Sequence, residues 1–291
     1  MRKGNDIMKI GLSANMYQNA YDRWGELRYK KLKEHGFSAM DFGMANTDSA
    51  IYKASEEELR KMMDNEKHLA EDAEIEFSQV HGPWRWPARD LTEEDREERM
   101  EKMKKSIYAT HLLGCKNWVV HPIMPYGVEE IDTENAEKTW ELNLCFMREL
   151  LKTAKEYGVT ICLENMPMHK FSIAKPEDIL KLVKTINDDN FKICLDTGHV
   201  SVFPDLSLGD EVRALGKEIR TLHIHDNRFE RDLHLPPFYG EINWADFAKS
   251  LKDINFDGVF SLETLPPANL ADDIFETLCI QLYKIADGII N

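Results

Sequence analysis

The sequence predicts an α/β protein that folds as a (β/α)8 TIM barrel, and two observations support this fold class. Short runs rich in β-branched and aromatic residues alternate with longer helical patterns, and eight such runs occur. The chain has 291 residues, a length that suits a closed barrel of parallel strands. An open doubly wound sheet is the alternative, but no G-x-G-x-x-G or G-x-x-x-x-G-K-[ST] turn follows an early strand.

The expected strands are distributed along the whole chain. They cover 8–15, 39–43, 76–82, 117–122, 160–165, 191–197, 220–226 and 258–264. Helical patterns fill the intervals, most clearly at 55–73, 93–113, 133–157 with Gly158 at its end, and 176–187, which opens on Pro-Glu. Because no linker rich in Pro, Gly or Ser divides the chain, we expect a single domain over residues 1–291.

Composition and charge favour a small polar substrate over nucleic acid. Hydrophobic residues make up 43% of the chain, which is enough for a large core. The 37 basic and 52 acidic residues give a formal net charge of −15, which opposes attraction to a phosphate backbone. Nucleic acid is therefore not the expected partner.

Cysteine use and the absence of apolar segments predict a cytoplasmic protein that does not enter a membrane. The five cysteines are odd in number, widely spaced and free of C-x-x-C pairs, so they indicate neither a disulfide framework nor a structural zinc cluster. No signal-peptide run and no membrane span are recognisable. The sequence does not indicate an oligomeric state.

Histidine and carboxylate side chains recur at the carboxyl ends of the expected strands, where barrels of this type carry their chemistry. In chain order they are His81, His121, Glu164, Asp196, His223, His225 and Glu263. Aliphatic residues alternate with them and can face the outer helices. A lone strand-end His is commonly a hydrogen-bonded structural residue, and a lone Asp commonly caps the next helix. Several together are costly to desolvate unless neutralised, so the pattern predicts a divalent metal site.

Four motifs, CLENMP, CLDTGH, LHIHDN and SLET, resemble in order and spacing those of the xylose-isomerase-like TIM-barrel superfamily. That superfamily includes sugar isomerases, 3-epimerases and endonuclease IV, and the resemblance spans nearly the whole chain. It implies one metal ion, Mn²⁺, Mg²⁺ or Co²⁺, and a set of four ligands: Glu164, Asp196, His223 and Glu263. His223 is chosen over His225 because the family places its metal histidine three residues before an acidic residue, here Asp226.

The resemblance also implies a reaction. Glu164 and Glu263 would act as acid and base on a small sugar, sugar acid or sugar phosphate through an enediolate, with His199 as an adjacent catalytic contact. His225 would face the same cavity and contact the substrate. The small-molecule partner is therefore expected to be a carbohydrate.

Two departures leave the substrate open. Ketose 3-epimerases place an arginine six residues after the metal histidine and a glutamate six residues after the first metal glutamate, where this chain has Phe229 and Lys170. Arg228 is a candidate to replace the arginine, and Lys170 suggests a negatively charged substrate. Trp84 and Trp86 are expected to wall a sugar, to form a lid on the barrel rim, or, with Arg85 and Arg89, to stack on nucleic acid.

The endonuclease IV branch supplies the alternative hypothesis, a multi-zinc phosphoesterase. Five further side chains occupy places that match its additional ligands: His81, His121, His199, Asp232 and His234. The surrounding motifs differ, since residues 232–244 resemble a D-x-H-L-P-P…G-x-I-x-W pattern of uncharacterised isomerase-like proteins. Asp232 and His234 thus either bind metal or order the loop by hydrogen bonds. A third hypothesis is a barrel that retains metal without catalysis.

Overall fold

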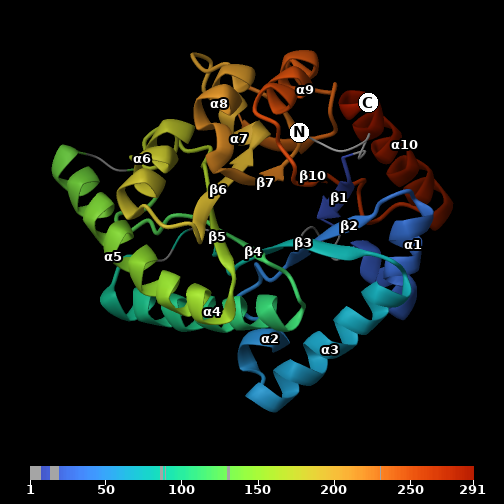
Figure 1. Cartoon of the computed structure of the whole chain (residues 1–291), viewed down its shortest axis with the longest axis horizontal. Coiled ribbons are helices and arrows are strands. Elements are labelled where there is room, and N and C mark those ends of the chain that lie inside the picture. Colours follow the sequence, from blue (N-terminus) through green and yellow to red (C-terminus); the bar gives the residue numbers. More distant parts are fainter. Residues whose placement is uncertain (1–7, 14–19, 86–87, 89, 130–131, 230) are drawn as a thin grey trace.

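Eight parallel strands close into a barrel in the computed structural model, and helices surround it (Figure 1). The structure describes residues 8–13, 20–85, 88, 90–129, 132–229 and 231–291. The barrel strands are β1 (Ile10–Ser13), β2 (Ala39–Gly43), β3 (Glu76–His81), β4 (Asn117–Val120), β5 (Thr160–Glu164), β6 (Phe191–Asp196), β7 (Ile219–His223) and β10 (Phe260–Leu262). Their order is β10-β1-β2-β3-β4-β5-β6-β7. This confirms the predicted fold class, a single-domain (β/α)8 barrel.

The barrel closes between its last two strands. The Ile224 amide donates to the Ser261 carbonyl at 2.9 Å, and the Glu263 amide donates to the Ile224 carbonyl at 2.8 Å. Because these bonds join Ile224, the residue after β7, to the end of β10, Glu263 is placed beside the last residues of β7.

Helices follow the strands and cover the outside of the barrel (Figure 1). Their bounds are η1 (Ala20–Leu27), α1 (Arg28–Glu34), α2 (Ala50–Lys53), α3 (Glu56–Asp72), α4 (Glu93–Leu112), α5 (Thr133–Tyr157), α6 (Pro176–Ile186), α7 (Thr197–Ser201), α8 (Leu208–Leu215), η2 (Gly216–Glu218), α9 (Trp244–Asp253) and α10 (Asp272–Ile290). The four helices expected from the sequence are confirmed, because their end signals act as predicted. Capping boxes begin α3 at Ser55 and α4 at Thr92, and Gly158 ends α5 with a φ of 65°.

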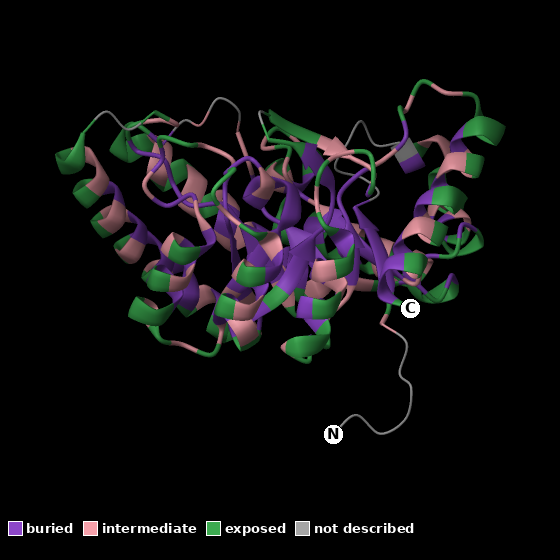
Figure 2. Cartoon of the chain, turned by 90° about the horizontal axis from the view of Figure 1, so that it is seen from above, coloured by how far each residue is buried: buried purple, intermediate pink, exposed green. Residues whose placement is uncertain are grey.

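Buried residues gather in the strands and on the inward helix faces (Figure 2). Aliphatic strand residues such as Ile161, Leu163 and Leu195 belong to one large cluster, which also includes helix residues such as Leu150 and Leu182. Val119, Cys162 and Cys194 form a separate buried cluster from β4, β5 and β6. The predicted alternation is therefore present: aliphatic residues face the helices, and smaller side chains fill the barrel.

The chain departs from the expected strand pattern after β7. The expected strand 220–226 ends at His223, and an antiparallel hairpin follows, made of β8 (Asp226–Arg228) and β9 (Arg231–Leu235). The expected strand 258–264 is limited to Phe260–Leu262, and the end of the expected strand 8–15 lies outside the described residues. No helix in the described part of the chain combines the length and apolar character that a membrane crossing requires.

Candidate metal centre

The carboxyl ends of the strands surround a cavity of about 300 Å³. Its lining residues are Ala45, His81, Trp84, His121, Glu164, Met166, Pro167, Met168, His199, Asp232, His234 and Glu263. Histidines and carboxylates therefore form one part of the wall, while Trp84 and the segment 166–168 form an apolar part. This is the end of the barrel at which the sequence predicted the site.

Four ligand-type side chains meet beside this cavity. Glu164 ends β5, Asp196 ends β6, His223 ends β7, and Glu263 follows β10. They are no more than 2% exposed, and one potential ligand atom from each lies within 4.8 Å of the others. His223 Nδ1 is 3.0 Å from Glu164 Oε1 and 3.3 Å from Glu263 Oε2.

The chemistry of this group fits a divalent cation. Carboxylate and imidazole together are ligands for Mn²⁺, Co²⁺ and Zn²⁺. Both His223 Nδ1 and Glu263 Oε2 are buried, and neither has a hydrogen-bond partner among the described residues. Unsatisfied buried polar atoms are costly, so atoms of this kind aimed at one another indicate that a ligand belongs between them.

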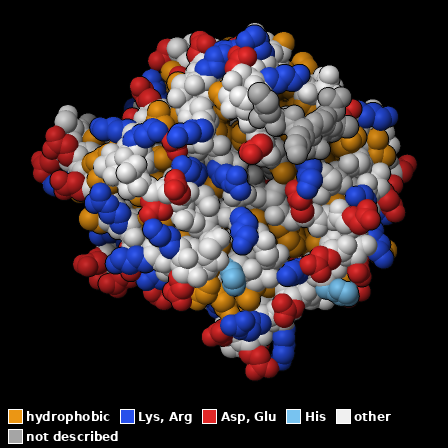
Figure 3. Space-filling view, in the orientation of Figure 1, with side chains coloured by type: hydrophobic (Ala, Val, Ile, Leu, Met, Phe, Trp, Pro, Cys, Tyr) orange, Lys and Arg blue, Asp and Glu red, His pale blue; other side chains and the backbone are white. Residues whose placement is uncertain are grey.

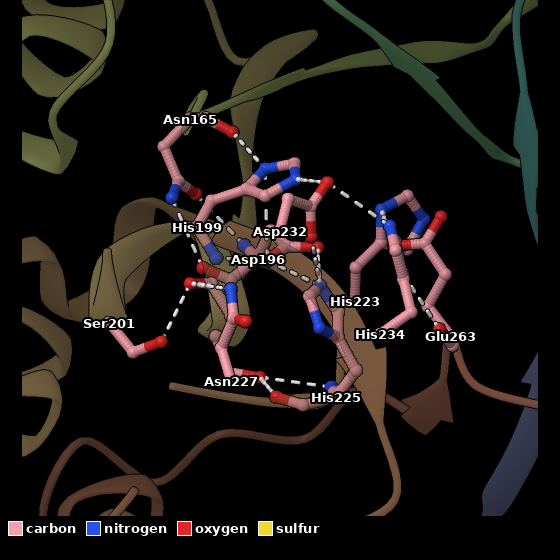
Figure 4. Close-up of polar contacts among 12 residues, drawn as sticks. Asn165, Asp196, His199, Ser201, His223, His225, Asn227, Asp232, His234 and Glu263 are labelled. Atoms are coloured by element: carbon pink, nitrogen blue, oxygen red, sulfur yellow. Dashed lines mark hydrogen bonds and ion pairs between the residues drawn. The ribbon is translucent and has the colours of Figure 1, made fainter. Parts of the chain in front are cut away.

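A second group of ligand-type side chains contacts the first, since His225 Nε2 lies 3.0 Å from Asp196 Oδ1. It consists of His199, His225, Asp232 and His234, again with one potential ligand atom of each within 4.8 Å of the others. Asp232 Oδ2 lies between two imidazoles, 3.2 Å from His199 Nε2 and 3.2 Å from His234 Nε2 (Figure 4). These contacts tie the β8–β9 hairpin to α7, and the same side chains are potential ligands for a metal.

A third group shares Glu164 with the first. His121 Nε2 is 3.0 Å and His81 Nε2 is 3.6 Å from Glu164 Oε2. All three side chains are buried. The five side chains expected as additional ligands therefore do lie around the same cavity as the first four.

Backbone carbonyls orient three of these histidines. His81 Nδ1 bonds the Gly82 carbonyl at 2.8 Å, His199 Nδ1 bonds the Asn165 carbonyl at 2.7 Å, and His234 Nδ1 bonds the Glu263 carbonyl at 3.0 Å. A carbonyl only accepts, so each Nδ1 carries the proton and each Nε2 faces the carboxylates. This is the arrangement that presents Nε2 to a metal.

Burial and neighbouring charges separate the two glutamates. The pKa of Glu263 lies well above its ordinary value, and burial of the carboxyl group is the main cause. The nearby Glu164 and Asp196 raise it further, and His223 only partly opposes these effects. Burial would also raise the pKa of Glu164, but His223 and His121 hold it well below its ordinary value. The surroundings in the protein alone therefore favour the ionised form of Glu164 and the protonated form of Glu263. A divalent cation bound beside them would lower the pKa of both carboxyl groups.

Burial lowers the pKa of His121 and of His199, but neighbouring carboxylates reverse the net shift for His199. It lowers the pKa of His121 to about 4, although Glu164 acts against it. For His199, burial lowers the pKa, but Asp196 and Asp232 outweigh it and raise the pKa well above its ordinary value. Asp196 also accepts a hydrogen bond from the His199 amide at 2.7 Å and so caps α7. Asp196 therefore caps a helix, as a lone strand-end Asp commonly does, and also belongs to the group of potential metal ligands.

Sequence reasoning missed a clamp that holds the hairpin over the site. Asp226 is fully buried, and its carboxylate accepts from the Trp244 indole at 2.9 Å and from the Ile242 amide at 3.2 Å. A Cβ on Gly240 would lie 2.2 Å from Asp226 Oδ1 and from the Asn227 carbonyl oxygen. The G-x-I-x-W pattern therefore marks a loop fastened to Asp226, and the buried acid after LHIH was the signal for it.

A second missed contact lies inside the barrel. Asp41, in the middle of β2, and Gln79, on β3, are both buried and lie below the site. Asp41 Oδ2 is 2.8 Å from His223 Nε2. An acid inside the otherwise apolar run AMDFG was a signal that this strand contributes to the site.

Some of the residues expected to contact the substrate line the cavity, and others do not. Trp84 lines the cavity, with its ring edge-to-face on His121 at a centroid distance of 4.4 Å. His225 is fully buried and bonds Asp196 Oδ2 at 3.1 Å. Lys170 and Arg228 are not among the lining residues; the Lys170 ammonium is 3.6 Å from Glu129, and the Arg228 guanidinium bonds the Tyr239 carbonyl. Trp86 lies outside the described residues.

The sequence matches known proteins over most of its length. The profile of the family described as "Xylose isomerase-like TIM barrel" matches residues 29–279. The chain is 28% identical to uncharacterized protein MJ1311 of Methanocaldococcus jannaschii, over 80% of this chain and 77% of that protein. It is also 28% identical to D-psicose 3-epimerase of Ruminiclostridium cellulolyticum, over 53% of this chain and 49% of the epimerase.

Solved structures share the fold. A D-tagatose 3-epimerase-like protein superposes with a TM-score of 0.75 at 26% identity, covering 98% of both chains. The IOLI protein with a bound zinc atom superposes with a TM-score of 0.75 at 21% identity, covering 97% of this chain and 98% of that one. Epimerases and a zinc-holding protein are thus among the proteins similar to this chain.

Proposed function

Because the chain belongs to the xylose isomerase-like TIM-barrel family, we propose that it is a divalent-metal-dependent isomerase or epimerase of a small sugar. The observation that carries this proposal is the buried group Glu164, Asp196, His223 and Glu263 at the edge of a sugar-sized cavity. The similarity to D-psicose 3-epimerase and to a D-tagatose 3-epimerase-like protein supports the reaction class.

In this proposal the four clustered side chains hold the cation, and two of them also move protons. A bound divalent cation supplies Lewis-acid polarisation of a carbonyl and its neighbouring hydroxyl. Glu164 removes the proton from the carbon beside the carbonyl, and Glu263 returns a proton to the resulting enediolate. His199 lines the cavity and would contact the oxygens of the substrate. Epimerisation follows if the proton returns to the opposite face of the same carbon.

The lining of the cavity favours an uncharged sugar as the substrate. Trp84, Met166 and Met168 supply apolar surface for the carbon skeleton, and the histidines supply hydrogen bonds for hydroxyls. Among the described residues that line the cavity, none is Lys or Arg. A phosphate would therefore meet no Lys or Arg side chain among these lining residues, although Lys170 had suggested a charged substrate.

Solvent exchange tests this proposal directly. The metal-loaded protein is incubated with uncharged ketoses in deuterium oxide, and deuterium at the carbon beside the carbonyl is measured by NMR. Glu263→Gln removes one proton-transfer group, so exchange should fall by at least about 100-fold. Glu34→Gln makes the same change on α1, where the side chain is 61% exposed, and should leave exchange unchanged. If no ketose exchanges, or if Glu263→Gln exchanges like wild type, the proposal is wrong.

A second candidate function is a multi-zinc phosphoesterase, favoured by the two further groups of potential ligands. The net charge of −15 acts against a nucleic-acid substrate, and acidic and basic side chains are interspersed over the face seen in Figure 3. His81→Ala and His234→Ala separate the two candidates. A mononuclear site would keep one tightly bound metal in both variants, whereas an extended zinc site would lose zinc and cleavage of abasic DNA together.

A further inference from the structure

His223 is held in the opposite sense to the other oriented histidines of the site. In His81, His199 and His234, Nδ1 bonds a backbone carbonyl and Nε2 faces the carboxylates. In His223, Nε2 bonds a side-chain carboxylate, Asp41, and Nδ1 faces Glu164 and Glu263. The orientation of the His223 ring therefore depends on a side-chain contact and not on a backbone carbonyl.

Side chains and backbone of three strands, β2, β3 and β7, make the contacts that orient His223 inside the barrel. Asp41 Oδ2 on β2 lies 2.8 Å from His223 Nε2 on β7. The Gln79 side-chain amide on β3 bonds the same Asp41 oxygen at 3.0 Å and the Leu222 carbonyl at 3.2 Å. Both groups that face the Gln79 amide are acceptors, so its NH₂ must point toward them. Gln79 thereby fixes Asp41 against the strand that carries His223.

The chemistry of the contact determines where the proton of His223 resides. An ionised carboxylate accepts hydrogen bonds and donates none, so the Nε2 that faces Asp41 carries a hydrogen. In the neutral ring Nδ1 is then the atom with the free lone pair, and it points into the group formed by Glu164, Asp196 and Glu263. All three partners, Asp41, Gln79 and His223, are no more than 1% exposed, so water does not compete for these bonds.

We propose that Asp41, fixed by Gln79, is the positioning residue that orients His223 and presents its Nδ1 to the cation. This inference rests on the proposed function, since it assumes that a cation binds at Glu164, Asp196, His223 and Glu263. Asp41 touches neither cation nor substrate in this role. It acts through His223 by fixing the ring's direction and the position of its proton.

Cobalt binding tests the proposal without reference to catalysis. The apoprotein is titrated with Co²⁺, and the dissociation constant and the visible absorption bands of bound Co²⁺ are recorded for wild type, Asp41→Ala and Asp41→Asn. Loss of such an outer partner typically weakens metal binding about 10–100-fold. We expect that loss for Asp41→Ala, with altered bands because the imidazole is no longer held in place. Asp41→Asn has nearly the same shape and can still accept from Nε2, so it should bind with intermediate affinity.

Ser13→Ala is the matched control. Ser13 is the β1 neighbour of Asp41 in the sheet register and is equally buried, and its hydroxyl has no hydrogen-bond partner within the described part of the chain. It should bind Co²⁺ with wild-type affinity and bands. If both Asp41 variants match Ser13→Ala, the positioning role is wrong while the metal centre stands. If the wild type itself binds no Co²⁺, the metal centre is wrong, and the role of Asp41 falls with it.

Discussion

At the residue scale, the CLDTGH motif contains a glycine that leaves room for an imidazole. A Cβ on Gly198 would lie 1.9 Å from Cε1 of His225 and 2.3 Å from its Nδ1. Since real Cβ atoms do not approach so closely, Gly198 permits α7 to pack against the histidine ring. The absence of a side chain at Gly198 thus leaves the space that the His225 ring of the second group occupies.

Gly198→Ala is therefore expected to displace His225 and disturb the second group. If that group holds metal, the variant should lose the additional metal and keep the ion bound by Glu164, Asp196, His223 and Glu263. Metal content per chain after exhaustive dialysis is the measurement. Retention of every ion present in the wild type would show that His225 is not needed for metal binding.

Strand-end residues could be placed from sequence, whereas contacts across the barrel could not. Alternation sets the face on which Glu164, Asp196 and Glu263 lie, their place at the carboxyl ends of parallel strands sets the end of the barrel, and they do lie together. Asp41 meets His223 across 182 residues of sequence. That contact depends on how strands β2 and β7 face one another across the closed barrel, which no single strand pattern encodes.

At the element scale, the β8–β9 hairpin carries Asp232 and His234 to the site and is fastened by one buried carboxylate. Asp226 accepts hydrogen bonds from the Asn227 and Ile242 amides and from the Trp244 indole. The sequence predicted a patterned loop here but no hairpin, because β8 has only three residues and only Ile224 and His225 separate it from the end of β7. Helices were easier to predict, since caps such as Ser55 and Gly158 act locally.

Gly240→Ala is expected to release this hairpin. The added methyl would lie 2.2 Å from the Asn227 carbonyl, so the loop must shift and weaken its bonds to Asp226. Limited proteolysis should therefore cut within 229–243 faster than in the wild type, and metal bound through Asp232 or His234 should weaken.

Gly288→Ala provides the matched control for that substitution. Gly288 lies within α10, and a Cβ there would meet nothing within 4 Å. Because alanine favours the helix over glycine, this variant should gain up to about 1 kcal/mol in free energy of unfolding and leave loop cleavage unchanged. Equal cleavage rates in Gly240→Ala and Gly288→Ala would contradict the clamp.

At the scale of the whole molecule, the barrel is held by its apolar surroundings, and one buried histidine outside the site makes its stability depend on pH. The His35 ring accepts from or donates to the Tyr21 hydroxyl at 2.7 Å and lies edge-on to the rings of Tyr21 and Trp24. Burial lowers the pKa of His35, although Glu276 acts against it. The folded protein therefore resists protonation of this ring more than the unfolded chain does.

The sign of the pH effect follows from that difference. As pH falls below the ordinary histidine pKa of 6.5, the unfolded chain takes up the proton first, so the folded state loses stability until the folded pKa is passed. His35→Asn cannot titrate and keeps a polar atom near the Nδ1 position, so its free energy of unfolding should fall less between pH 7.5 and 5.5. Urea unfolding at both pH values measures this. His68→Asn, at an exposed histidine, should behave as wild type; an identical loss in all three proteins would contradict the account.

The number and order of the strands followed from the sequence, because each βα unit carries its own pattern of periodicity and end signals. The closure of the barrel between Ile224 and Glu263 could not be predicted in this way. It depends on backbone hydrogen bonds between two strands, and the pattern of a single strand does not specify which residues of another strand it pairs with. That closure brings Glu263 beside His223 and so completes the candidate metal centre.

The most direct test of the central claim is elemental analysis of the purified, undialysed protein together with Glu263→Gln. The account predicts at least one divalent metal ion per wild-type chain and a clear loss of metal in the variant, because Glu263 supplies one of the four clustered ligand atoms. A wild-type protein that carries no stoichiometric divalent metal, and takes up none when it is offered, would contradict it.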